Sequence, residues 1–152
     1  FACLDGEPPA VVLHFAMHGK FDPTGPQDGL ILIDGVVEPD MIIGTALPHQ
    51  PFVFLNACQV GQAGETLGQY GGMAQAFVEA GASAVIAPLW AVQDDVAREV
   101  SLRFYEAAFS GISPGELLRN ERAQMRDSGT HLAYVLYGHP ALQLTRSEPR
   151  AP

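Results

Sequence analysis

Basic side chains are scarce in this sequence. Only 8 lysines and arginines stand against 17 aspartates and glutamates, which gives a formal net charge of -9. A surface with this balance repels phosphate backbones and anionic lipid headgroups, so we expect no nucleic acid and no membrane as partner. A basic peptide remains an acceptable substrate.

Cysteine and long apolar runs are also in short supply. The two cysteines, Cys3 and Cys58, lie far apart and do not form the disulfide framework typical of small secreted domains. We therefore expect a reducing compartment and a cytoplasmic protein. No apolar run approaches the length of a transmembrane helix, and no signal peptide is visible.

Two kinds of catalytic motif are missing. No pair of histidine, cysteine or acidic residues has the spacing of zinc ligands, so we expect no metal, and we expect no other cofactor. The Gly-x-Ser-x-Gly elbow of many serine hydrolases is absent too. An esterase that acts on small molecules is therefore the weakest of the functions considered.

What the sequence does contain is an alternation of short apolar runs with amphipathic segments. Strands of a mostly parallel open sheet alternating with flanking helices, an α/β fold, have this pattern. The 152 residues of the chain suffice for one domain. We predict this domain at residues 10–146, after a connector at 1–9 and before a flexible tail at 147–152. The predicted strands are 11–15, 30–33, 52–55, 84–87 and 131–136, and the predicted helices are 40–47, 72–80, 94–109 and 113–126.

Two predicted strands end in residues suited to thiol catalysis. His18 follows the strand at 11–15, and Cys58 follows the buried strand at 52–55. Neighbouring parallel strands end on the same side of a sheet, where open α/β sheets place their ligands. A nearby imidazole can activate the Cys58 thiol as a nucleophile. The alternative is that Cys58 is a small buried apolar residue.

Residues around these two complete the predicted site. The backbone N–H groups of Gly19 and Cys58 are candidates for an oxyanion hole, because glycine leaves the backbone unshielded. His14 shares a strand face with Ala16 and His18 by the two-residue period. We interpret His14 as a supporting histidine and not as a second base.

Several characteristic stretches follow one another in the sequence. They are Leu13-His14-Phe15-Ala16-Met17-His18-Gly19, Leu55-Asn56-Ala57-Cys58-Gln59-Val60-Gly61, Ala76-Phe77-Val78-Glu79-Ala80-Gly81-Ala82, Leu89-Trp90-Ala91-Val92-Gln93-Asp94-Asp95, Phe104-Tyr105 and Tyr137-Gly138-His139-Pro140. In this order they resemble the CHAT domain, a caspase-like peptidase domain often joined to tetratricopeptide repeats. The resemblance covers about residues 10–144, and its stretch around Cys58 is a looser match to the Gln-Ala-Cys-x-Gly motif of caspases.

This resemblance implies a cysteine endopeptidase with a Cys58–His18 dyad and a protein or peptide substrate. Related separases use an acidic residue to bind the P1 side chain, which points to Asp94, with Asp95 beside it; both also suit the positive end of a helix. The sequence departs from the family at Asn56 and Val60, where serine and threonine are usual. The alternative to an enzyme is a silent or inhibited caspase-like interaction module.

The resemblance also bears on completeness. The family fold has elements before the strand that carries the histidine, and only nine residues precede that strand here. We therefore expect the first elements to be missing from this chain, supplied elsewhere or altered. A preceding segment, a partner chain or a second copy is expected to complete the domain.

Overall fold

The computed structural model describes residues 11–20, 29–57, 72–124 and 132–144. Its centre is a four-stranded sheet with the order β1-β5-β6-β7. Strands β1 (Val12–Ala16), β5 (Phe52–Asn56) and β6 (Ala84–Pro88) are parallel, and β7 (Tyr134–Gly138) joins β6 in the antiparallel direction. The prediction of an open, mostly parallel sheet is confirmed.

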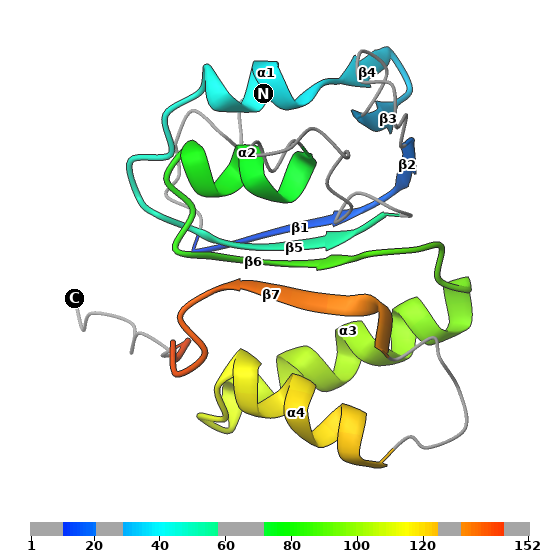
Figure 1. The fold of residues 1–152 in the computed structure, drawn as a ribbon, viewed down its shortest axis with the longest axis vertical. Coiled ribbons are helices and arrows are strands. Elements are labelled where there is room, and N and C mark those ends of the chain that lie inside the picture. The colour runs from blue at the N-terminus through cyan, green and yellow to red at the C-terminus, as the bar shows by residue number, and fades with distance from the viewer. Residues whose placement is uncertain (1–10, 21–28, 58–71, 125–131, 145–152) are drawn as a thin grey trace, which may run out of the picture.

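Helices cover both faces of this sheet (Figure 1). Helices α1 (Pro39–Ile43) and α2 (Met73–Glu79) lie on one face, and α3 (Asp94–Phe109) and α4 (Pro114–Gln124) lie on the other. Ser113 caps the start of α4, because its Oγ accepts a hydrogen bond from the Glu116 N–H over 3.2 Å. The sheet is therefore the middle layer of three, as expected of an α/β fold.

Alternate residues of β5 contribute to two hydrophobic cores, one on each face of the sheet. Val53 and Leu55 belong to the cluster that contains α1 and α2, whereas Phe52 and Phe54 belong to the cluster that contains α3 and α4. Phe104 of α3 meets both phenyl rings, with centroids 5.1 Å from Phe52 and 4.9 Å from Phe54. Burial on both faces explains why this strand reads as a continuous apolar run.

A second sheet was not predicted and corrects the expected path of the chain after β1. Strands β2 (His18–Lys20), β3 (Gly29–Leu32) and β4 (Gly35–Val37) pair in the antiparallel direction in that order. The sequence predicts a polar loop from Lys20 to Gly29 between the strands at 11–15 and 30–33, and this loop is wrong at both ends, because Lys20 and Gly29 face each other in adjacent strands. Residues 21–28 between them lie outside the described part of the chain.

Two other predicted boundaries are shifted. Helix α1 ends at Ile43, with Gly44 as its C-cap, instead of continuing to residue 47. The last strand begins at Tyr134 instead of residue 131 and continues to Gly138. Gly138 has φ 146°, and a Cβ there would lie 2.5 Å from Ala84 Cβ on the neighbouring strand, so only glycine fits this end of β7.

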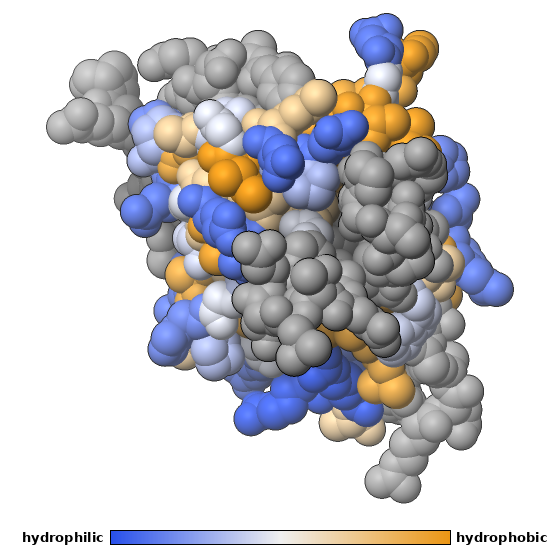
Figure 2. All heavy atoms as spheres, turned by 45° about the horizontal axis from the view of Figure 1, so that its top comes forward, coloured by the Kyte–Doolittle hydropathy of each residue, from blue (hydrophilic) through white to orange (hydrophobic). Residues whose placement is uncertain are grey.

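Apolar side chains are exposed on the side of the molecule that carries β3, β4 and α1. Figure 2 shows hydrophobic residues gathered there. Ile33, in the turn after β3, is 99% exposed, and others on these elements are 40–48% exposed. They are Ile31, Leu32, Val36, Met41 and Ile43.

Candidate active site

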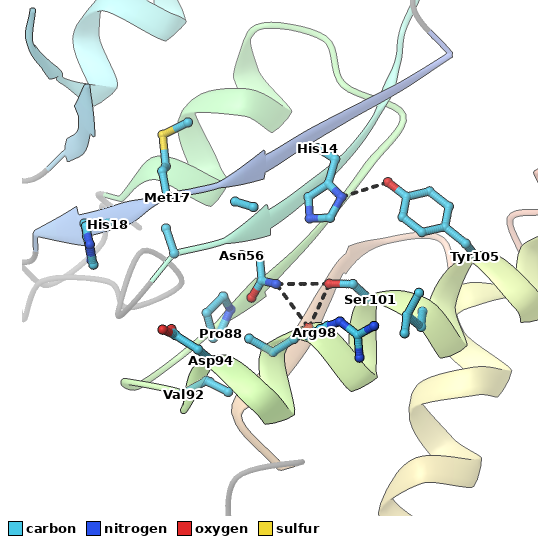
Figure 3. A pocket seen from close by; sticks show the side chains of 14 residues that line it. His14, Met17, His18, Asn56, Pro88, Val92, Asp94, Arg98, Ser101 and Tyr105 are labelled. Atoms are coloured by element: carbon cyan, nitrogen blue, oxygen red, sulfur yellow. Dashed lines mark hydrogen bonds between the residues drawn. The ribbon is translucent and has the colours of Figure 1, made fainter. Parts of the chain in front are cut away.

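A pocket of about 500 Å³ opens at the carboxyl ends of the parallel strands, between the sheet and α3 (Figure 3). Strands β1, β5 and β6 supply one wall, and the first three turns of α3 supply the other. Open α/β sheets bind ligands at this end of their strands. The lining residues are His14, Ala16, Met17, His18, Asn56, Ala57, Pro88, Val92, Asp94, Ala97, Arg98, Ser101, Leu102 and Tyr105.

The pairing of β1 with β5 brings the two predicted catalytic segments to one place. Ala16 and Asn56 are the last residues of the two strands and lie opposite each other. The Met17 N–H donates a hydrogen bond to the Asn56 carbonyl over 3.3 Å. His18 and Ala57 therefore line the same pocket. Cys58 is the residue after Ala57 and lies outside the described residues, so the Cys58–His18 dyad stays a prediction.

His18 and Gly19 lie on β2, the strand that follows the break at Met17. Their backbones face Ile31 and Leu30 on β3, which fixes the position of this segment. The His18 side chain is exposed and lines the pocket. Gly19 is not among the residues that line it, and its predicted part in an oxyanion hole stays a prediction.

The two predicted specificity residues differ in position although they are neighbours in the first turn of α3. Asp94 lines the pocket, and its carboxylate lies on the same side of it as His18 in Figure 3. Asp95 does not line the pocket; its Oδ1 accepts a hydrogen bond from the Val96 N–H over 2.8 Å. The N-cap residue Gln93 makes no side-chain capping bond. Asp95 is therefore the residue that bonds the helix start, and Asp94 is the one that lines the pocket. The specificity role of both residues stays a prediction.

Asn56 is a structural residue of the site that sequence reasoning missed. Its Nδ2 donates to the Ala97 carbonyl over 3.1 Å and to Ser101 Oγ over 3.0 Å. The Tyr134 hydroxyl donates to Asn56 Oδ1 over 2.7 Å. This amide joins the end of β5 to α3 and β7 immediately before Ala57 and Cys58. An amide at the end of an otherwise apolar strand was the only signal available in the sequence.

Replacing Asn56 with alanine is expected to lower the free energy of unfolding by about 1–3 kcal/mol, because buried partners lose their bonds. Ser101 is 8% exposed and Tyr134 0%. Chemical denaturation measures the change. The matched control is Gln75→Ala, which removes an exposed amide bonded to Glu79 over 3.0 Å and should cost less than about 0.5 kcal/mol. Equal effects of the two substitutions would contradict the assigned role of Asn56.

His14 lies in the pocket wall, beside the core residue Phe54. Its Nδ1 lies 3.0 Å from the Tyr105 hydroxyl, and its ring meets Phe54 edge to face with centroids 5.0 Å apart. Partial burial lowers the pKa of His14 and raises the pKa of Tyr105. Both groups are therefore uncharged near pH 7, and the tyrosine can donate to the ring. The interpretation of His14 as a supporting histidine stays a prediction.

Neither a metal cluster nor a membrane span is found in the part of the chain that the structure describes. Within it, no three histidine, cysteine or acidic side chains gather as metal ligands would. No helix among the described residues has the length and apolar character needed to cross a bilayer.

Comparison with known proteins agrees with the resemblance seen in the sequence. The family model described as the CHAT domain matches residues 2–147, which is nearly the whole chain. The curated proteins give no match.

Proposed function

This chain belongs to the CHAT domain family, which is related to caspase-like cysteine peptidases, and we propose from that premise that it is a cysteine endopeptidase. The observation that carries the proposal is one shared pocket. His18 lines it, and so does Ala57, the residue before Cys58. The two residue types that thiol catalysis needs therefore belong to segments that end at the same place.

The proposed reaction follows from these two side chains. His18 takes the proton of the Cys58 thiol, and the thiolate attacks the carbonyl carbon of the scissile peptide bond. Backbone N–H groups, those of Gly19 and Cys58 in this proposal, stabilise the oxyanion that forms. His18 then gives its proton to the leaving amine as the C–N bond breaks. Water, deprotonated by His18, hydrolyses the acyl-enzyme and restores the thiol.

The proposed substrate is a protein or peptide chain that lies in the pocket, with Asp94 as the group that selects the P1 side chain. No metal and no organic cofactor takes part in this chemistry. Two features agree with a working place in the cytoplasm: a free thiol must stay reduced, and the chain has only two cysteines.

We further propose that a preceding segment, a partner chain or a second copy completes the domain. Among the described strands, β1 pairs with β5 on one side and with none on its other side. A strand edge of this kind offers unpaired backbone groups to another chain. The exposed apolar side chains on β3, β4 and α1 offer a second surface for contact.

Digestion of a peptide library tests the proposed activity. The protein should cleave peptides internally, and mass spectrometry of the products identifies the residues on both sides of each cut. The Cys58→Ala protein, purified in the same way, is the control for contaminating proteases. Equal cleavage by the control, or no cleavage by the parent protein, would contradict the proposal and favour a silent interaction module.

A further inference from the structure

The polar groups that line the pocket fall into two sets. Asn56 and Ser101 are occupied by their bonds to α3 and to each other, and the Tyr105 hydroxyl is bonded to Nδ1 of His14. Asp94, His18 and Arg98 make no ion pair with any described residue. The second set is therefore available to a ligand, and it contains a positive charge as well as the negative one already assigned to the P1 side chain.

Arg98 differs from the other arginines of the described chain. Arg103 pairs with Glu99 and with Glu121, Arg119 pairs with Glu116, and Arg122 donates to the Tyr134 carbonyl. Arg98, which is exposed and lines the pocket, makes neither an ion pair nor a hydrogen bond with the residues that the structure describes. In a chain with a net charge of -9, this guanidinium stands out as an unneutralised cation in a cleft.

His14 is a second candidate hydrogen-bond donor in the same pocket. In the tautomer in which the Tyr105 hydroxyl donates to Nδ1, the ring proton lies on Nε2 and can be donated to a ligand. In Figure 3 this second nitrogen lies on the side of the ring away from Tyr105, and both His14 and Arg98 line the pocket. A guanidinium and an N–H group that line one pocket can both donate to a carboxylate.

The spacing of the charges matches an extended peptide. Asp94 and Arg98 are four residues apart on α3, which is about 6 Å along a helix at ~1.5 Å per residue. In an extended chain, side chains on the same side are about 6.6 Å apart, because alternate residues share a side. A peptide that runs along α3 with its basic side chain at Asp94 therefore presents beside Arg98 the side chain two positions away.

We propose that Arg98 and His14 form a second subsite, which binds an acidic side chain of the substrate two residues away from its basic P1 residue. This inference rests on the proposed function for the position of P1. It narrows the substrate class from basic peptides to peptides that carry both charges in this spacing. The opposing account is that Arg98 only offsets the charge of Asp94 through solvent.

Binding to the Cys58→Ala protein tests the subsite without turnover. Fluorescence anisotropy would compare labelled peptides that have arginine at P1 and glutamate, glutamine or lysine two positions before or after it. The glutamate peptide should bind about fivefold to tenfold more tightly than the glutamine peptide, and this preference should fall at high salt. Arg98→Gln should abolish the preference, and Arg98→Glu should transfer it to the lysine peptide.

A charge-matched control separates a local effect from one of net charge. Arg119→Gln removes the same charge from α4, where the arginine side chain is 75% exposed, and should leave the glutamate preference intact. Equal binding of the three peptides, or equal losses in the two arginine variants, would overturn the subsite. If the preference is found but the parent protein does not cleave these peptides, the subsite stands and the proposed peptidase function fails. If the parent protein cleaves these peptides without the glutamate preference, the proposed peptidase function stands and the subsite fails.

Discussion

Replacing Cys58 with alanine is expected to abolish peptide cleavage, with a loss of at least about 10³-fold, because the proposed acyl-enzyme forms on the sulfur of Cys58. His18→Ala should cause a loss of similar size at pH 7. The His18 variant should recover part of its activity as the pH rises toward 9, because an unassisted thiol then ionises by itself. The Cys58 variant should not recover. The rate of hydrolysis of one internally quenched peptide between pH 6 and 9 measures both profiles.

Loss of folding is the competing explanation for inactive variants. The His18 side chain is exposed, and its backbone pairing with Ile31 does not depend on the imidazole. His18→Ala should therefore change the free energy of unfolding by less than about 0.5 kcal/mol. Unchanged turnover in either variant, or inactivity accompanied by a collapse of stability, would contradict the dyad.

Replacing Asp94 with asparagine is expected to lower cleavage after lysine and arginine by about 30-fold or more. That loss corresponds to about 2 kcal/mol, the lower end of the cost of removing one partner of a buried charge pair. The lower end applies because Asp94 is exposed in the free protein and is covered only when a substrate binds. Cleavage after uncharged residues should stay within about twofold, and kcat/KM for peptides that differ only at P1 measures both effects.

The neighbouring carboxylate provides the matched control for Asp94. Asp95→Asn weakens the hydrogen bond to the Val96 N–H and removes a negative charge from the helix start. It should therefore lower the free energy of unfolding by about 0.3–1 kcal/mol without changing the P1 preference. The competing account assigns helix capping to both residues. Equal effects of the two substitutions on P1 preference, or no basic preference in the parent protein, would contradict the specificity role of Asp94.

The sequence predicts the central four-stranded sheet well, because the apolar pattern of each strand is a local signal. Phe52 to Leu55 is apolar on both faces, and only a strand between two helical layers buries every position of such a run. The same reasoning indicated that His14, Ala16 and His18 face one way, and all three line the pocket. The carboxyl ends of β1 and β5 could therefore be predicted as the place of the site.

Contacts between distant segments are what the sequence did not reveal. The partner of His18 on β3 lies 13 residues further along the chain, so β2 is defined by pairing and not by its own three residues. The bonds of Asn56 reach α3 and β7, 41 to 78 residues away. The unpaired state of Arg98 becomes visible only when the partners of the other arginines are known.

The pH dependence of alkylation at the two cysteines tests the central claim most directly. The protein would be treated with iodoacetamide between pH 5 and 9, and digestion followed by mass spectrometry would give separate rates at Cys3 and Cys58. Since an imidazole partner keeps a thiol ionised, Cys58 should still react rapidly at pH 6, whereas the rate at Cys3 should fall about tenfold per pH unit below about 8.5. In the His18→Ala protein the two profiles should coincide. Coincident profiles in the parent protein would contradict a Cys58–His18 dyad.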